Sequence, residues 1–250
     1  MKKVKDNFSN RSDEYKLNRP IYPMALFDEI LGHVGAYDVC WDCATGSGQM
    51  ASSIADKFER VVATDISQNQ LDKAPQLPNV KYIKCRAEET PIENGSVNLI
   101  IVGQAVHWFD FNAFYNEVRR VASTEAVIAL IGYGLMQIDD GVNQHLHSFC
   151  YNTLGTYWDT ERSHIDNTYS TIPFPFESIE LENEHFIEDR WTLQQFHGYL
   201  NTWSSVARFI QKNGEDPVQH LISQLLSLGA WNEDEQKALR FPLFTKIGKV

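Results

Sequence analysis

The feature that most limits the fold is a short strand that runs into a glycine-containing turn and then into a helix. Residues 39–42 form the predicted strand, 44–48 (Ala-Thr-Gly-Ser-Gly) the turn, and 49–58 a helix with apolar residues at four-residue spacing. Glycines at the carboxyl end of a strand let the backbone approach a ligand closely. The turn therefore predicts a ligand-binding α/β protein.

The rest of the first half repeats this alternation. Further strands are predicted over 61–65, 80–85, 97–102 and 126–131, and helices over 68–74, with Ser67 as N-cap, and 112–122. Strands separated by helices favour a parallel sheet with helices on both faces. We therefore predict a three-layer, doubly wound α/β fold.

After Gly134 the pattern changes. Residues 135–176 have no clean period and are predicted to be an insertion with helical pieces. A strand is expected over 177–186, helices over 193–210 and 218–228, and a last strand over 241–250. The prediction is a single domain over 1–250. It comprises an N-terminal lid or helix (1–30), a cofactor-binding core (36–134), a mainly helical cap over an acceptor site (135–176 and 190–230) and final strands (177–189 and 240–250).

Charge and hydropathy exclude some classes of protein. The formal net charge is −11, which disfavours binding to nucleic acid or to an anionic membrane. The longest mostly apolar stretch, 126–136, is too short to span a bilayer, and no apolar run follows the first residues. We expect a cytoplasmic protein, monomeric or homodimeric, with a small-molecule partner.

The spacing Cys40-x-x-Cys43 could indicate a metal or redox site. The two residues lie at the end of a strand, where positions three apart point to opposite faces. His145 and His147 lack a third ligand at useful spacing. We therefore expect buried thiols and no metal.

Three acids in the first half indicate the ligand. Asp65 ends the second strand, nineteen positions after Gly46, where a carboxylate can bind ribose hydroxyls. Glu88, which follows Ala87 after the third strand, can receive an adenine amine. Asp42 stands just before the turn, where it would repel a pyrophosphate but suits an ammonium group.

The turn departs from the dinucleotide fingerprint because Ala44 takes the place of the first glycine, and a P-loop lysine is absent. S-adenosylmethionine (SAM) combines adenosine with an ammonium group and carries no phosphate. SAM is therefore the favoured ligand, with a dinucleotide or a ligand-free turn as alternatives.

With these motifs the chain resembles class I SAM-dependent methyltransferases of the type-11 group, and among them the trans-aconitate methyltransferase-like small-molecule enzymes. The resemblance extends over nearly the whole chain. Beyond the turn and the acids it rests on segments 8–9, 19–23, 104–110 (Gln-Ala-Val-His-Trp-Phe-Asp), 157–158, 174–176, 200–204 and 240–242. Ala44 stands where the family usually has glycine, and we expect it to cost little if its φ stays negative.

The resemblance implies a seven-stranded sheet of order 3-2-1-4-5-7-6 with the last strand antiparallel. It also implies that Asp42 lies at the methionine moiety of SAM, Asp65 at the ribose and Ile66 at the adenine. The cofactor-binding residues expected are Asp42, Ala44, Thr45, Gly46, Gly48, Gln49, Asp65, Ile66, Ala87, Glu88 and Gln104.

The expected reaction is methyl transfer to a small metabolite on oxygen, possibly a carboxylate, with S-adenosylhomocysteine as product. His107 and Trp108 are the candidate catalytic residues, and Tyr15, Tyr22 and Trp203 the candidate substrate-binding residues. A carboxylate needs no general base, so His107 can instead be an orienting residue. The alternatives are an N- or C-methyltransferase and a SAM-binding protein without transferase activity.

Overall fold

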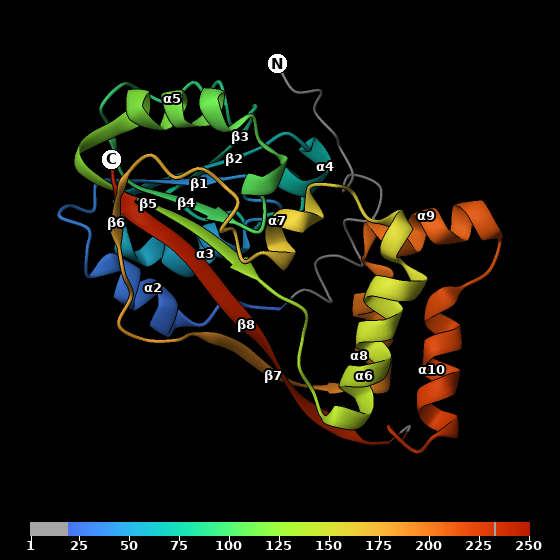
Figure 1. The fold of residues 1–250 in the computed structure, drawn as a ribbon. Coiled ribbons are helices and arrows are strands. Elements are labelled where there is room, and N and C mark those ends of the chain that lie inside the picture. Colours follow the sequence, from blue (N-terminus) through green and yellow to red (C-terminus); the bar gives the residue numbers. More distant parts are fainter. Residues whose placement is uncertain (1–19, 233) are drawn as a thin grey trace.

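The computed structural model describes residues 20–232 and 234–250. Its centre is one sheet of order β3-β2-β1-β4-β5-β8-β6, with β7 paired to β8 beside this row (Figure 1). The strands are β1 (Val39–Cys43), β2 (Arg60–Asp65), β3 (Val80–Lys84), β4 (Val97–Gly103), β5 (Ala122–Tyr133), β6 (Glu177–Ile179), β7 (Phe186–Thr192) and β8 (Gln236–Lys249). Strands β1 to β5 are parallel, and β8 is antiparallel to β5. The predicted fold class and antiparallel last strand are confirmed.

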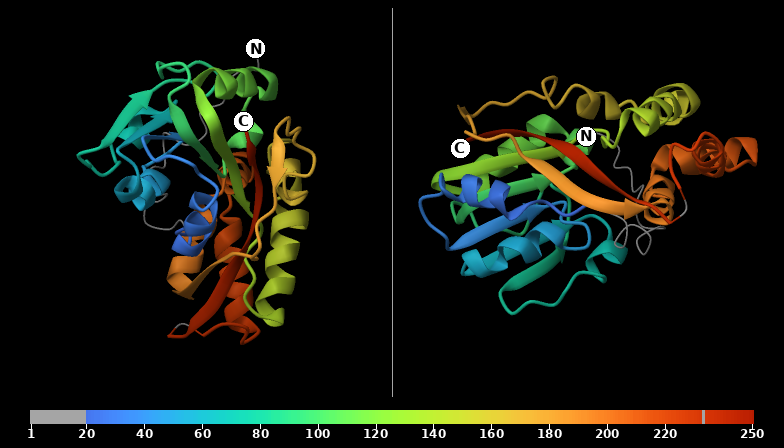
Figure 2. Two further views of the ribbon diagram at one scale, coloured as in Figure 1. Left: turned by 90° about the vertical axis from the view of Figure 1, so that its left-hand side faces the viewer. Right: turned by 90° about the horizontal axis from the view of Figure 1, so that it is seen from below.

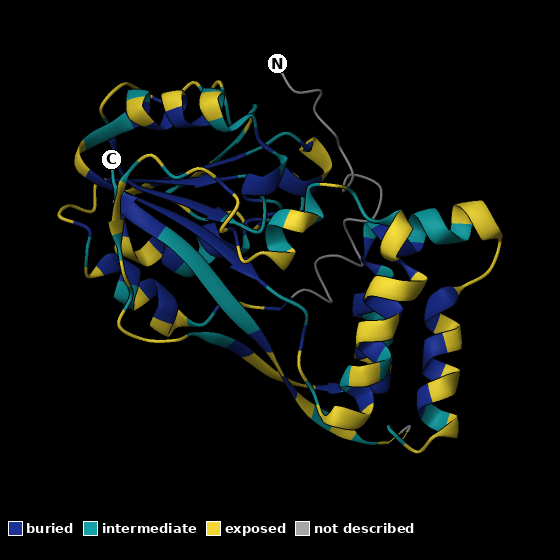
Figure 3. Cartoon of the chain, viewed as in Figure 1, coloured by how far each residue is buried: buried dark blue, intermediate teal, exposed yellow. Residues whose placement is uncertain are grey.

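Both faces of the sheet are buried, which explains the nearly continuous apolar runs in its strands. In β4, Leu99 and Ile101 pack into one apolar cluster, and Ile100 and Val102 pack into a second cluster on the opposite face. Helices α2 and α3 cover the first face and α5 covers the second (Figures 1 and 3). The helices of this part are α2 (Met24–Leu31), α3 (Gln49–Ile54), α4 (Gln68–Leu71) and α5 (Phe111–Val121).

Two predicted helices are shorter than expected. Helix α3 ends at Ile54, and a 3₁₀ turn over Ala55–Lys57 takes its place. Helix α4 ends at Leu71, although Ser67 caps it as predicted by accepting a hydrogen bond from the Gln70 amide.

Helices α6 (Asp140–Ser148), α8 (Leu193–Asn201), α9 (Ser204–Asn213) and α10 (Pro217–Ser227) gather in a lobe beside the sheet (Figure 1). Helix α7 (Arg162–Asp166) lies closer to the sheet, where Ile165 packs against the second apolar cluster. The helix predicted over 193–210 is two helices. It breaks at Thr202 and Trp203, because Trp203 has extended backbone angles and the Thr202 hydroxyl donates to the Tyr199 carbonyl.

The strand predicted over 177–186 was wrong in its bounds. Strand β6 stops at Ile179, and β7 begins only at Phe186. Between them, the backbone amides of Glu182 and Asn183 donate to the carboxylate of Glu29 in α2 instead of to a neighbouring strand. We call this contact the Glu29 clamp.

Strand β8 pairs with different strands along its length. Its segment 243–249 pairs with β5 inside the sheet, and its segment 236–242 pairs with β7. The resulting β7–β8 ribbon runs from the sheet to the helical lobe (Figure 2). The lobe is therefore connected to the edge of the sheet by a two-stranded ribbon.

Candidate active site

Every second residue of the turn after β1 has a positive φ angle, in the left-handed region. Gly46 and Gly48 have φ values of 58° and 79°, and Ala44 has a φ of 58°. The expectation of a negative φ at Ala44 was therefore wrong, and a side chain there costs roughly 1–2 kcal/mol relative to the right-handed conformation. The Thr45 amide donates to the Thr64 carbonyl at 2.9 Å, which bends the turn back over β2.

Asp42, the last residue but one of β1, is buried beneath this turn. Its Oδ2 accepts hydrogen bonds from the Thr45 hydroxyl at 2.5 Å and from the Ala51 amide at 2.9 Å. Burial raises the pKa of Asp42 to about 7, although these hydrogen bonds oppose the shift. A buried carboxyl with such a pKa favours a cationic ligand group that would restore its charge.

Asp65, the last residue of the neighbouring strand β2, is hydrogen-bonded to the turn. Its Oδ2 accepts a hydrogen bond from the Gly46 amide at 2.9 Å, and its Oδ1 accepts one from the Ser67 amide at 2.8 Å. Ile66 is half-buried beside it.

Glu88 has partners within the protein. Its Oε1 accepts from the Asp110 amide at 3.1 Å, and its Oε2 accepts from Nε of Arg86 at 3.2 Å. Ala87 is half-buried. The residue predicted to meet adenine thus also connects the end of β3 to the start of α5.

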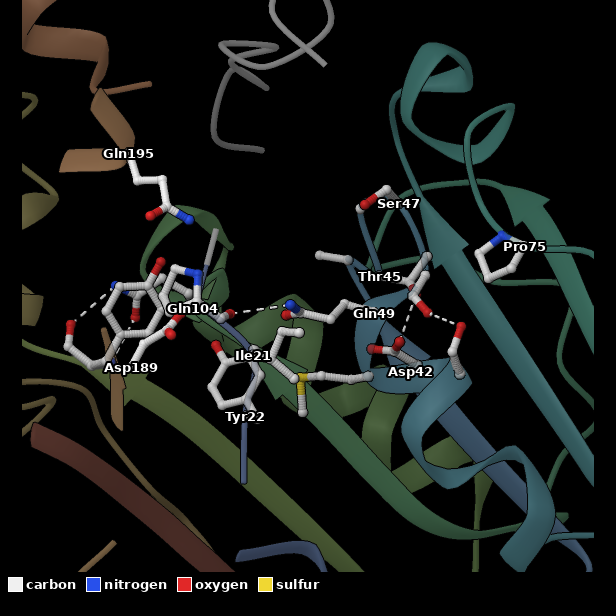
Figure 4. A pocket seen from close by; sticks show the side chains of 18 of the residues that line it. Ile21, Tyr22, Asp42, Thr45, Ser47, Gln49, Pro75, Gln104, Asp189 and Gln195 are labelled. Atoms are coloured by element: carbon white, nitrogen blue, oxygen red, sulfur yellow. Dashed lines mark hydrogen bonds between the residues drawn. The ribbon is translucent and has the colours of Figure 1, made fainter. Parts of the chain in front are cut away.

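A cavity of about 510 Å³ opens next to the turn (Figure 4). It is lined on one side by Asp42, Ala44, Thr45, Gly46, Gly48 and Gln49, and on the other by Tyr22, Gln104, Tyr133, Asp189, Trp191 and Gln195. Of the predicted cofactor-binding residues, Asp65, Ile66, Ala87 and Glu88 are not among those lining it. Among its described lining residues the charged side chains are the acids Asp42 and Asp189.

Sequence reasoning missed Asp189, Trp191 and Gln195. They come from β7 and the first turn of α8. No local motif marks them, because the ribbon with β8 brings them to the cavity.

A second, smaller cavity of about 90 Å³ lies on the lobe side. It is lined by Gln104, His107, Trp108, Tyr133, Gly134, Leu135, Trp158, Asp159, Arg162, Ile165, Tyr199, Thr202, Trp203 and Ser204. It therefore brings together the 104–110 and 202–204 segments, which are far apart in the sequence. Trp158, Asp159 and Arg162 come from the insertion and were not predicted as site residues.

Gln104 and Tyr133 line both cavities. The Gln104 side chain is fixed because it donates to the Tyr133 carbonyl at 3.1 Å and accepts from the Tyr133 amide at 3.0 Å. Gln104 also has a φ of 52°, a strained value for a residue with a side chain. The wall between the two cavities is thus a rigid pair at the ends of β4 and β5.

The two candidate catalytic residues lie on a 3₁₀ turn over Val106–Trp108. His107 is buried, and its Nδ1 lies 3.5 Å from the Tyr169 hydroxyl. Trp108 is half-buried, with its ring centroid 4.9 Å from that of His107.

The candidate substrate-binding residues are not together. Tyr22 is buried and lines the cavity at the turn, with its ring 6.2 Å from that of Tyr133. Trp203 lines the second cavity, with its ring 5.2 Å from that of Trp158. Tyr15 and the predicted lid before Pro20 lie outside the described residues.

Cys40 and Cys43 are buried free thiols whose pKa values are raised by burial. Within residues 20–232 and 234–250, no group of three or more His, Cys, Asp or Glu side chains could hold a metal ion. None of the helices described there is both long and apolar enough to cross a membrane.

The cavity at the turn has the volume of a small-molecule site and an acidic lining. Comparison with known proteins decides the family. Residues 41–130 match the methyltransferase domain. A protein of Dictyostelium discoideum described as a methyltransferase is 31% identical over 253 residues, covering 99% of this chain and 96% of that protein. This chain belongs to the methyltransferase family.

Two further relatives agree with this assignment. A Saccharomyces cerevisiae protein described as a SAM-dependent methyltransferase is 22% identical, with 84% of each chain covered. A solved structure from Anaeromyxobacter dehalogenans, described as a type II methyltransferase, has a TM-score of 0.85 at 36% identity. It covers 92% of this chain and 97% of that one. The methyltransferase fold and SAM as cofactor are confirmed, and the resemblance to the trans-aconitate methyltransferase-like subgroup stays a prediction.

Proposed function

We propose that this methyltransferase transfers a methyl group to an oxygen of a small metabolite that binds in the cavity of Trp108 and Trp203. The observation that carries the proposal is the shared wall: Gln104 and Tyr133 line this cavity and also the cavity at the turn. A donor in one and an acceptor in the other would meet beside Gln104. The helical lobe would act as the cap over the acceptor.

On the cofactor side, we propose that Asp42 binds the ammonium group of SAM and Asp65 its ribose. Gly46 supports this because a ligand can approach its backbone freely: an added Cβ there would meet no atom within 4 Å. Ile66 and Glu88 would lie at the adenine, with Glu88 sharing its carboxylate with Arg86 and the Asp110 amide.

SAM supplies an electrophilic methyl group on a sulfonium, so the chain mainly has to align the acceptor and exclude water. Trp108 and Trp203 would form apolar walls for the acceptor. We propose that His107 orients the 3₁₀ turn rather than removing a proton, because it is buried and its Nδ1 faces the Tyr169 hydroxyl. This role fits a carboxylate or another acceptor that needs no general base.

An N- or C-methyltransferase and a SAM-binding protein without transferase activity are the alternatives. The net charge of −11 supports an enzyme that does not act on nucleic acid, and we propose that it works in the cytoplasm. Monomer and homodimer are both compatible with the proposal.

The test is to incubate the protein and a metabolite extract with SAM labelled in the methyl group and to identify the labelled product. Trp108→Ala should then lower single-turnover transfer on the order of 100-fold, since a small misplacement of the acceptor has that effect. SAM affinity should change much less. His107→Ala should reduce the rate little.

Three results would contradict the proposal. A labelled product methylated on nitrogen or carbon would establish an alternative reaction. Normal turnover in Trp108→Ala would show that the acceptor binds elsewhere. A loss of about 100-fold or more in His107→Ala would show that the histidine is a base.

A further inference from the structure

The second cavity contains an arginine held flat against a tryptophan. Arg162 begins α7, and its side chain is 16% exposed. Its guanidinium carbon lies 3.9 Å from the Trp158 ring centroid and 6.0 Å from that of Trp203. Stacking on an indole ring fixes the plane of a guanidinium and weakens its contact with water. The orientation of this cation is therefore set before any ligand arrives.

Arg162 makes few hydrogen bonds within the protein. A guanidinium has five N–H donors, and the hydrogen bond formed here is a weak one from Nη2 to Sγ of Cys150, at 3.5 Å. Nε is buried and has no hydrogen-bond partner among the described residues. The Asp166 carboxylate lies 3.5 Å from Nε, and its side chain is 32% exposed. That ion pair is partly screened by water.

Arg208 in helix α9, by contrast, has strong hydrogen-bond partners. It donates to the Tyr157 carbonyl at 3.0 Å and to the Asp159 carboxylate at 2.6 Å. Asp159 lines the second cavity, so Arg208 offsets the one acidic side chain among its described lining residues. Arg162 is the remaining arginine among the described residues that line this cavity.

We propose that Arg162 binds a carboxylate of the methyl acceptor, which makes the acceptor an organic acid with a flat apolar body. The proposal rests on the proposed function, because it assumes that the acceptor occupies this cavity. A planar guanidinium matches a carboxylate through two parallel hydrogen bonds, and Trp108, Trp158 and Trp203 supply aromatic walls for the body.

The test uses matched pairs of acids and neutral amides: benzoate with benzamide, cinnamate with cinnamamide, and hydrocinnamate with its amide. Binding is followed by the tryptophan fluorescence of the full chain with S-adenosylhomocysteine present, so it requires no turnover. Wild type should bind at least one acid about 10-fold more tightly than its amide, a difference of about 1.4 kcal/mol. Arg162→Gln should bind the acid and the amide equally, and Arg162→Lys should lie between the two.

Arg240→Gln is the matched control. Its guanidinium also lies over an aromatic ring, 4.8 Å from the centroid of Phe186, but it lines neither cavity. This variant should keep the preference for the acid. No preference in wild type, or a preference that survives in Arg162→Gln, would overturn the proposal. Calorimetry with S-adenosylhomocysteine distinguishes failure of this inference from failure of the proposed function. If wild type binds S-adenosylhomocysteine normally but shows no preference for the acid, only the role of Arg162 is rejected. If wild type does not bind S-adenosylhomocysteine, the proposed function is rejected.

Discussion

At the scale of single residues, Ala44 stores strain in the turn that lines the larger cavity. Its φ of 58° is a conformation that glycine adopts without steric cost. Ala44→Gly should therefore raise the free energy of unfolding by roughly 0.5–1 kcal/mol, after the larger entropy loss of glycine is subtracted. Urea denaturation measures this as a higher midpoint at an unchanged slope.

Ala51→Gly is the opposing control, because Ala51 lies in helix α3. It should lower stability by about 1 kcal/mol. If Ala44→Gly destabilised the protein as much as this control, the left-handed strain at Ala44 would be disproved.

Asp42 links stability to pH. Its pKa is raised to about 7 by burial, so the folded state keeps a proton that the unfolded chain releases above its ordinary pKa near 4. Stability from this group is therefore highest at low pH, falls as the pH rises from about 4 to about 7, and is constant above that.

Asp42→Asn should remove this slope and stabilise the ligand-free protein at pH 8 by an amount on the order of a few kcal/mol. If Asp42 binds the ammonium group of SAM as proposed, the same change should weaken SAM binding by about 1.5–3 kcal/mol, because a hydrogen bond to a charged group is lost. Thermal melts from pH 5 to 8 and calorimetry with SAM are the measurements. A parallel pH dependence in wild type and variant would assign the slope to other groups.

At the scale of elements, the Glu29 clamp determines where two strands end. Burial alone would raise the pKa of Glu29, but hydrogen bonds from His185, Asn183 and the Glu182 amide lower it to about 2. The contribution of the clamp to stability is therefore present above pH 4.5 and lost as the pH falls toward 2.

Glu29→Ala should free the segment between β6 and β7, since its backbone amides lose their acceptor. Hydrogen–deuterium exchange of peptides that cover residues 180–185 should speed up by 10-fold or more at pH 7. Glu180→Ala, a change of an exposed acid in the same segment, should leave the exchange unchanged. Equal protection in both variants would show that the segment is held by other contacts.

This clamp also explains a limit of prediction from the sequence. Alternating Ile179, Leu181 and glutamates predicted one strand, and nothing nearby in the sequence marks Glu29 as the partner that interrupts it. The same applies to Asp189 and Gln195, which approach the cavity at the turn only through the β7–β8 ribbon. In contrast, β1, its turn and Asp65 were predictable because a strand, a turn and its neighbouring strand are local patterns with a shared chemistry.

The environment of Arg162 could be predicted from the sequence only in part. The sequence shows an arginine in an aromatic insertion, but not that its guanidinium stacks on Trp158 or that its buried Nε lacks a hydrogen-bond partner. Such properties depend on packing between segments that no local period encodes. The sequence therefore predicted that Trp108 and Trp203 lie near one another, and both line the second cavity, but it did not predict how Arg162 is packed there.

At the scale of the whole molecule, the lobe and the sheet share one apolar core. Trp203 and Phe196 of the lobe belong to the same buried cluster as Leu99 and Ile101 of β4. We therefore expect one cooperative unfolding transition rather than two. Far-ultraviolet circular dichroism and tryptophan fluorescence should give coincident denaturation curves, with equal calorimetric and van't Hoff enthalpies. Two separated transitions would show that the lobe folds independently of the sheet.

The position of β8 has a consequence for how the protein is made. β5, β6 and β7 all pair with residues 236–249, which leave the ribosome after every one of these strands. Until then the apolar edge of β5 has no neighbour on that side and is open to pairing with other chains. Newly synthesised protein should therefore depend on chaperones until β8 has emerged, and translational pauses before residue 236 should lower the yield of native enzyme.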